Sequence, residues 1–195
     1  MIDEKILRKF GAVEKRLEKG EILFLEGNEA FFYYQILSGV IKMNNYNENG
    51  REMIQGLFTK GQSFGEPALL GNFPFPANAE AVEKAHLICL EKSLFFEMQK
   101  KCPEISIQLL EVISKRLQFK AMIAKEISGY EAEHRILTLL HYLKKNSKQE
   151  KEFCINMTRQ TIASLIGLRV ETVIRSVNEL KQKGSLKIKG RKIYI

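Results

Sequence analysis

One stretch near the end of the chain, residues 158–180, most constrains the fold. Its sequence, TRQTIASLIGLRVETVIRSVNEL, divides at Gly167 into two short segments with helical periodicity. Thr158 stands where a side-chain oxygen can cap the first helix, and Gly167 permits the tight turn that must follow. In the second segment, apolar residues recur at i, i+4 and i+7 and therefore share one face: Val173, Val177 and Leu180. The pattern predicts a helix-turn-helix.

The exposed face of the second predicted helix carries the chemistry for reading DNA. Arg175 can donate two bonds to the edge of a guanine, and Glu171 can accept one from the amino group of a cytosine. Val170 and Ile174 can contact the methyl group of a thymine. Arg169 stands at the position where Ser or Thr would cap the helix, so we expect it to contact a phosphate or a flanking base.

The same residues resemble a known motif. Thr158-Arg159-Gln160, Val170-Glu171-Thr172-Val173 and Arg175 are similar to the DNA-binding motif of the cyclic-AMP receptor protein and fumarate-nitrate reduction regulator (Crp/Fnr) family of bacterial transcription regulators. The resemblance implies that Thr158 and Arg159 also belong to the DNA-binding surface. It implies an inverted-repeat site, and the pair Val170 and Glu171 favours the TTGA-like half-site of the fumarate-nitrate type.

Positive charge is concentrated around this motif. Residues 144–195 hold 13 Lys and Arg against 4 Asp and Glu, whereas the preceding residues are close to neutral. A basic segment attracts a polyanion such as double-stranded DNA, although without the motif it would equally fit a solvated surface. Gly184–Ile195 has the pattern of a hairpin that turns at Gly190-Arg191. We expect a winged helix-turn-helix with three cations near the wing tip: Lys189, Arg191 and Lys192.

The amino-terminal half has the pattern of a β structure. After a helix expected over residues 1–16, glycines punctuate short apolar runs, and Asn49-Gly50 is a strong turn signal. This predicts an antiparallel barrel or roll, closed by a strand within residues 82–95. Phrases such as KGEILFLEG and YYQILSGVIKM resemble the cyclic-nucleotide-binding β roll of the same family. The predicted fold class is α+β, with a β roll (1–102), a dimerisation helix and hinge (103–129) and a winged helix-turn-helix domain (130–195).

The predicted roll lacks the means to hold a cyclic phosphate. In nucleotide-binding members of the family, a Gly-Glu pair holds the ribose and a later Arg-Ser pair grips the phosphate. Gly65 and Glu66 match the first pair, but Phe75 and Pro76 occupy the positions of the second. A buried phosphate needs a cation and aligned donors, so cyclic AMP and cyclic GMP are not expected. The site is either a remnant closed by Phe73 and Phe75 or a pocket for a less anionic effector.

One long helix is expected between the two domains. Pro103 can occupy its first turn, and Ser128-Gly129-Tyr130 predicts its end and a hinge, because glycine costs about 1 kcal/mol inside a helix. Steps of three and four along it form a near-heptad seam: Leu109, Val112, Arg116, Phe119 and Ile123. In the family this helix forms the interface of a homodimer. The family's adenine contacts would fall on Lys120 and Ala121, which again disagree with cyclic AMP.

No metal or redox centre is expected. The cysteines, Cys89, Cys102 and Cys154, are widely spaced, which fits neither a disulfide framework nor a CxxC metal site. Some family members carry an iron-sulfur cluster on amino-terminal cysteines, but the first 88 residues here contain none. A di-iron site would need two Glu-x-x-His pairs, and Glu131 with His134 is the single pair. We therefore expect no metal, iron-sulfur cluster, haem or cyclic AMP.

Three hypotheses of different classes are compared. The first is a sequence-specific transcription regulator without catalytic activity, with RNA polymerase as a further partner if it activates. The second is a ligand sensor or architectural module that binds DNA with little sequence specificity. The third, an enzyme using His134, His141 or Cys154, lacks any nucleophile–base arrangement. Acidic residues in MIDEKILRKF do not suit a signal peptide, and no apolar run is long enough to span a bilayer, so we expect a cytoplasmic location.

Overall fold

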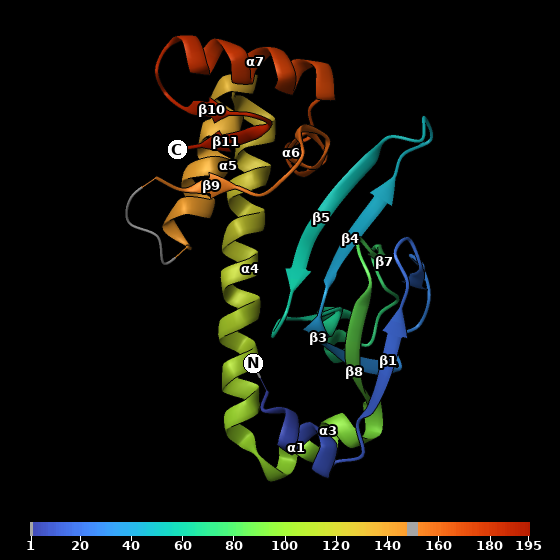
Figure 1. Cartoon of the computed structure of the whole chain (residues 1–195). Coiled ribbons are helices and arrows are strands. Elements are labelled where there is room, and N and C mark those ends of the chain that lie inside the picture. The colour runs from blue at the N-terminus through green and yellow to red at the C-terminus, as the bar shows by residue number, and fades with distance from the viewer. Residues whose placement is uncertain (1, 148–151) are drawn as a thin grey trace. The chain divides into compact units, whose positions relative to one another are not determined.

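The structure is a computed structural model that describes residues 2–147 and 152–195 (Figure 1). The chain divides into two compact units, the first ending at Arg116 and the second running from Leu117 to Ile195. The boundary lies inside one continuous helix, α4 (Pro103–Gly129), so each unit contains part of it. Within the described ranges, no helix has the length and apolar character needed to cross a membrane.

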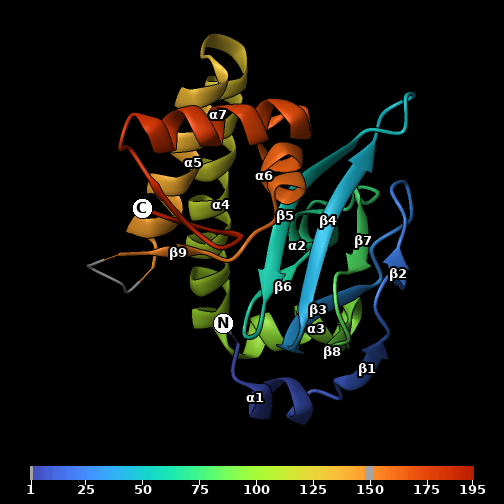
Figure 2. The same ribbon diagram turned by 45° about the horizontal axis from the view of Figure 1, so that its top comes forward.

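The first unit is a β roll of two antiparallel four-stranded sheets, shown from a second direction in Figure 2. One sheet has the strand order β1-β8-β3-β6 and the other has the order β2-β7-β4-β5. The strands are β1 (Val13–Leu17), β2 (Ile22–Phe24), β3 (Phe32–Ser38), β4 (Val40–Tyr46), β5 (Glu52–Thr59), β6 (Ser63–Phe64), β7 (Asn78–Ala81) and β8 (Ala85–Glu91). The helices of this unit are α1 (Glu4–Lys9), α2 (Glu66–Gly71) and α3 (Lys92–Lys101). The roll predicted from the glycine-punctuated pattern is confirmed.

The chain passes from one sheet to the other at Gly39, between β3 and β4. Gly39 has a φ of +87°, and a Cβ atom there would lie 2.4 Å from the carbonyl oxygen of Lys84. Only glycine combines this left-handed conformation with so close an approach of backbone to backbone. The sheets can therefore fold over each other at this corner.

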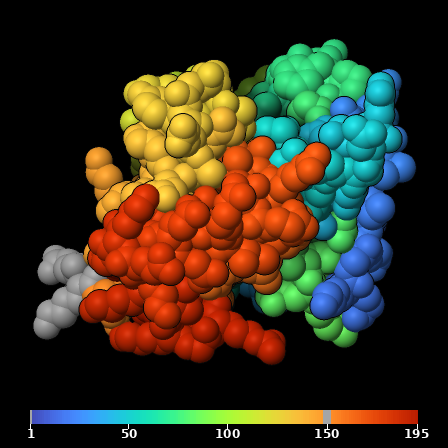
Figure 3. All heavy atoms as spheres, turned by 90° about the horizontal axis from the view of Figure 1, so that it is seen from above, coloured from blue at the N-terminus to red at the C-terminus, as the bar shows by residue number. Residues whose placement is uncertain are grey.

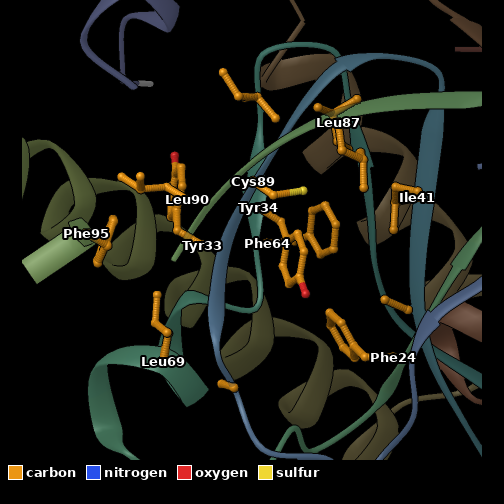
Figure 4. Packing of buried hydrophobic residues seen from close by; sticks show 14 of the residues in the cluster. Phe24, Tyr33, Tyr34, Ile41, Phe64, Leu69, Leu87, Cys89, Leu90 and Phe95 are labelled. Atoms are coloured by element: carbon orange, nitrogen blue, oxygen red, sulfur yellow. The ribbon is translucent and has the colours of Figure 1, made fainter. Parts of the chain in front are cut away.

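Aromatic rings fill the space between the two sheets. The rings of Phe24 and Phe75 are stacked with centroids 3.6 Å apart, and Tyr34 stacks on Phe64 at 5.6 Å. Figure 4 shows Phe24, Tyr34 and Phe64 gathered in this core. Each of these rings is at least nine-tenths buried, so the core of the roll is closed without a bound molecule.

The amino-terminal helix is shorter than the sequence predicts. The prediction of a helix over residues 1–16 is wrong, because α1 ends at Lys9 and β1 begins at Val13. Gly11, with a φ of +89°, turns the chain between them. β1 is an edge strand with one buried residue, Leu17, so its apolar residues do not alternate and its strand character is hidden.

The second unit is a winged helix-turn-helix. It contains the end of α4, then α5 (Ala132–Lys145), α6 (Arg159–Ile166) and α7 (Val170–Gln182). Its small sheet has the order β10-β11-β9, with β9 (Cys154–Ile155), β10 (Lys187–Lys189) and β11 (Lys192–Tyr194). The predicted helices, turn and hairpin are confirmed. Residues 145–152, KNSKQEKE, have the sequence of a polar linker between α5 and β9, and residues 148–151 of this segment lie outside the described residues.

The junction between α4 and α5 is fastened by side chains. Arg135 donates from Nε to the carbonyl of Tyr130 at 2.6 Å and from Nη2 to the carbonyl of Ile127 at 2.8 Å. Nδ1 of His134 lies 2.7 Å from the buried carboxylate of Glu126, and its ring stacks on Tyr130 with centroids 4.2 Å apart. The predicted helix end at Gly129 is confirmed, but these contacts bind the junction on both sides, which the prediction of a hinge did not foresee.

Candidate nucleic-acid interface

The first helix of the motif is fixed at both ends by the residues that the sequence singles out. Oγ1 of Thr158 accepts a hydrogen bond from the amide of Thr161 at 3.0 Å, which is a side-chain cap. Gly167 ends the helix with a φ of +68°. A Cβ atom at Gly167 would lie 3.4 Å from Cδ1 of Ile127, so the turn of the motif packs against the last turn of α4. The turn is thereby held in one place.

The second helix, α7, has one buried face and one exposed face. Val173, Val177 and Leu180 are at most 1% exposed and hold the helix on the rest of the unit. The residues predicted to read DNA lie on the other face, where they are exposed: Glu171, Ile174, Arg175 and Asn178. Ile174 is 48% exposed, so about half of its apolar surface stays in contact with water unless a partner covers it.

Two arginines of α7 are available to a partner. Among the residues that the structure describes, Arg175 has no hydrogen-bond or ion-pair partner. Arg169 is the N-cap residue of α7 but makes no side-chain cap, so its exposed guanidinium is not used to hold the helix. Val170, the first residue of the helix, is half-buried.

A groove of about 640 Å³ runs between α7 and the wing hairpin. Ile174 and Asn178 line it on the helix side, and Arg191 and Lys192 line it on the hairpin side. Arg159 also lines it and donates from Nη1 to the carbonyl of Arg191 at 2.6 Å, which ties the start of α6 to the wing turn. Figure 3 shows α7 and the wing, in orange and red, at the surface of the molecule. The arrangement offers an apolar floor with a cationic rim.

Lys189 differs from the other two cations predicted at the wing tip. Its ammonium group is bonded to the carboxylate of Glu152, whereas Arg191 and Lys192 have no carboxylate within ion-pair distance in the described ranges. Sequence reasoning missed Glu152 because it precedes β9 and lies 37 residues from Lys189.

The predicted effector site of the roll is filled by protein groups. Gly65 is the N-cap residue of α2 and has a φ of +77°, and a Cβ atom there would lie 2.9 Å from the ring of Phe75. Phe75 is 3% exposed and points into the core, whereas Pro76 is exposed and its carbonyl accepts from Nδ2 of Asn45 at 2.8 Å. Phe73 is 44% exposed, so Phe75 closes the site without it. Lys120, which the resemblance places at an adenine contact of this site, belongs to the second unit.

Glu66, matched by resemblance to a ribose-holding residue, is bonded within the protein. Its side chain is fully buried, and its two oxygens lie 3.0 and 2.8 Å from Nη1 of Arg116. Nη2 of Arg116 donates to the carbonyl of Ser63 at 2.6 Å, and the hydroxyl of Ser63 donates to the Glu66 carboxylate. The Arg116 guanidinium also lies 5.0 Å from the centre of the Phe58 ring.

Sequence reasoning missed this network, although Arg116 carried a signal. A charged residue within an otherwise apolar seam must find a partner when it is buried. The pattern did not say that the partner would be Glu66, 50 residues earlier.

The comparisons with known proteins agree with this architecture. Residues 14–102 match the family described as the cyclic nucleotide-binding domain, and residues 134–195 match the Crp-like helix-turn-helix domain. The chain belongs to the Crp/Fnr family of transcription regulators. The fumarate and nitrate reduction regulatory protein of Escherichia coli K12 is 29% identical over 186 residues, covering 93% of this chain and 74% of the relative. The anaerobic regulatory protein of Aggregatibacter actinomycetemcomitans is 27% identical over 186 residues, covering 93% and 72%.

Solved structures share the fold of this Crp/Fnr regulator. A CooA mutant from Carboxydothermus hydrogenoformans has a TM-score of 0.84 at 17% identity and covers all of this chain and 87% of its own. FixK2 from Bradyrhizobium japonicum has a TM-score of 0.78 at 23% identity, with 93% and 91% covered. The curated relatives are named as regulatory proteins, and residues 134–195 match a helix-turn-helix family, which agrees with the expectation of a transcription regulator without catalytic activity.

The predicted dimer seam of this Crp/Fnr regulator faces its own chain. Leu109 is 5% exposed within the core of the roll, and Val112 lines a small cleft with Tyr33 there. In the second unit, Ile123 is 7% exposed, and the ring of Phe119 packs on Tyr142 at 4.8 Å. The fifth seam residue, Arg116, forms the ion pair with Glu66 described above.

A second stripe of α4 is exposed instead. Ile107, Leu110 and Leu117 are 63, 65 and 68% exposed. They are spaced by the same alternating steps of three and four residues as the predicted seam. Periodicity alone therefore cannot show which of the two stripes packs within the chain. In the described residues, the predicted seam packs within the chain, and the stripe of Ile107, Leu110 and Leu117 is exposed.

Proposed function

We propose that this protein is a homodimer that reads an inverted repeat of double-stranded DNA with α7 and whose β roll takes no cyclic nucleotide. The observation that carries the proposal is the exposed face of α7. It combines an unpaired arginine, a carboxylate and an uncovered isoleucine on a helix that is firmly held from behind. Those are the groups that recognise guanine, cytosine and the thymine methyl in a major groove.

The rest of the DNA-binding surface supplies contacts to phosphates. Thr158 and Arg159 lie at the start of α6, next to the groove that Arg191 and Lys192 border. Contacts of this kind set the position of the protein on the duplex but do not read sequence. We therefore assign base reading to Glu171, Ile174 and Arg175, with Val170 and Arg169 at the edge of the helix, and positioning to the groove.

The homodimer is proposed to form through the exposed stripe of α4. The stripe follows heptad spacing, with large apolar residues toward its start and small residues toward its end: Ile107, Leu110, Ser114, Leu117, Ala121 and Ala124. Spacing of this kind brings two helices together along a seam, and small residues let their backbones approach closely. This stripe replaces the five-residue seam predicted from the sequence as the proposed interface.

The proposed lack of a cyclic nucleotide rests on the contents of the roll. Glu66 already accepts bonds from Arg116 and Ser63, and the ring of Phe75 lies where the resemblance places a phosphate-binding arginine. A phosphate entering there would meet the aromatic carbon of Phe75, and the Arg116 guanidinium is already bonded to Glu66. We also propose no metal cofactor, because the described residues contain no group of three side chains suited to hold one. An effector of another class would have to displace the packed Phe75 ring.

Selection of bound duplexes from a random pool tests the proposed function. A two-fold dimer places its two recognition helices in successive major grooves, so the selected sites should contain inverted half-sites about one helical turn apart. A pool that stays unselected would support the alternative, an architectural module with little specificity.

Two substitutions separate base reading from phosphate binding. Arg175→Ala should cost roughly 1–3 kcal/mol per half-site and relax the preference at one guanine. Lys192→Ala should weaken binding to selected and random duplexes alike. An equal loss on both duplexes in Arg175→Ala would make Arg175 a phosphate contact. RNA polymerase is proposed as a further partner only if a bound promoter is activated.

A further inference from the structure

The wing hairpin has an outer face that carries its lysines. Side chains alternate along β10, so Ile188 points toward the groove beside α7, whereas Lys187 and Lys189 point the other way. Lys189 stands directly opposite Lys192 of β11 in the antiparallel pair, and Lys192 also borders the groove at the wing tip. Lys187 and Lys189 are 74 and 56% exposed.

One carboxylate serves both lysines of β10. Oε2 of Glu152 is hydrogen-bonded to Nζ of Lys189, and Oε1 lies 3.5 Å from Nζ of Lys187. The ammonium group of Lys189 also lies 4.8 Å from the centre of the Tyr194 ring, which holds it over β11. The bond from Lys189 lowers the pKa of the Glu152 carboxyl, so Glu152 is charged at neutral pH. The positive charge of this part of the wing is partly cancelled before any DNA arrives.

The tip of the wing lacks such a partner. Arg191 and Lys192 border the groove next to α7, and within residues 2–147 and 152–195 no carboxylate lies at ion-pair distance from either. A phosphate near the tip is therefore attracted by two free cations. A phosphate near β10 has to compete with Glu152 for its cations, and like charges repel each other.

We propose that Glu152 limits sequence-independent DNA binding by acting as an internal competitor for phosphate at Lys187 and Lys189. The inference rests on the DNA-binding role of this domain. Attraction to phosphates supplies most of the non-specific affinity and grows with the number of cations that can reach the backbone. Glu152 reduces that number in each wing without touching the base-reading face of α7.

Binding of the full chain to a duplex of random sequence, measured by fluorescence anisotropy across a range of KCl concentrations, tests the proposal. Glu152→Gln should raise the affinity about two- to fivefold per wing, the range typical of exposed ion pairs. The plot of log affinity against log salt should steepen by about one unit for each phosphate that a released lysine neutralises. The ratio of affinities for a selected site and the random duplex should stay the same.

A matched control removes the same charge elsewhere. Glu97→Gln breaks the exposed pair with Lys101 on α3, in the other compact unit, and also raises the net charge by one. If Glu97→Gln and Glu152→Gln raised the affinity for the random duplex equally, the change in net charge would explain the gain, and the proposal would be overturned. Lys189→Ala supplies a second test, because it should change affinity little in the wild type but reverse the gain in Glu152→Gln. An equal loss in both backgrounds would show that Lys189 contacts DNA despite Glu152.

The failure of this inference differs from a failure of the DNA-binding role. A wild type that binds no duplex at any salt concentration would contradict both. Salt-dependent binding that Glu152→Gln leaves unchanged would contradict only the role of Glu152. Thermal unfolding of Glu152→Gln serves as the folding control, because an unfolded variant would lose affinity and not gain it.

Discussion

Replacing Arg116 by alanine tests what the bonds to the buried Glu66 contribute to stability. Glu66 is fully buried and Arg116 is 28% exposed, so the variant leaves a carboxylate in the core without its cation. It also removes the bond from Nη2 to Ser63 and the contact with the Phe58 ring. Breaking a buried ion pair costs about 3–5 kcal/mol, and the partial exposure of Arg116 favours the lower end of that range. We expect a loss of about 3 kcal/mol, or roughly 6–12 °C in melting temperature.

The assay is thermal unfolding followed by circular dichroism, at one protein concentration, because dimer formation would make the melting temperature depend on concentration. Arg8→Ala is the matched control. It removes an arginine from an ion pair with Glu14 in the same unit, but that pair is exposed, so the melting temperature should change little. Adding Glu66→Gln to Arg116→Ala removes the uncompensated charge and should recover part of the stability. The reasoning is refuted if Arg116→Ala melts within error of Arg8→Ala, or if the double variant melts lower than Arg116→Ala.

Three further predictions concern the turn, the helix stripe and the cysteines. Gly167→Ala forces a left-handed backbone on a residue with a side chain, so urea unfolding should show a loss of about 1–2 kcal/mol; unchanged stability would contradict the role of that turn. Leu110→Glu combined with Leu117→Glu should leave the chain folded but monomeric in analytical ultracentrifugation, and a persistent dimer would place the interface elsewhere. Burial raises the pKa of the Cys89 thiol to about 11. At pH 8, iodoacetamide should therefore label the half-buried Cys154 and leave Cys89 unmodified in the folded protein. Equal labelling of the two cysteines would contradict the burial of Cys89.

The helix-turn-helix could be predicted from the sequence because its signals are local. Thr158 caps a helix that begins at the next residue, Gly167 ends it, and the apolar positions of α7 repeat within three turns. Each of these features depends on residues that are close in sequence, so propensity and periodicity suffice. The start of α4 at Pro103 and its end at Gly129 were predicted for the same reason.

The parts that could not be predicted depend on contacts between distant residues. The partner of Glu66 lies 50 residues later, and that of Lys189 lies 37 residues earlier. No local pattern carries either pairing. The length of α1 was misjudged because β1, an edge strand, buries one residue and shows no alternation. Resemblance matched Gly65 and Glu66 to a family motif, but it did not reveal that Arg116 and Ser63 bond the glutamate.

The two stripes of α4 also bear on how strong the proposed dimer is. In each chain, Ile107, Leu110 and Leu117 are more than 60% exposed, and fully burying such a side chain contributes about 1.5–3 kcal/mol. Since each is already partly covered, the six side chains of a dimer would contribute about 6–12 kcal/mol. Association costs about 4–15 kcal/mol in lost freedom of motion, which is of the same size.

The small residues farther along the stripe add little apolar area, so the helix contacts alone favour a dimer that dissociates on dilution. Duplex DNA with two half-sites binds both recognition helices of a dimer at once. Its binding energy therefore stabilises the dimer relative to the separate chains. By the same linkage, the dimer dissociation constant should fall when a selected inverted repeat is present and should stay the same with a single half-site. Sedimentation at matched protein concentrations distinguishes these cases, and a dimer equally stable with either duplex would show that α4 contacts beyond the exposed stripe hold the chains together.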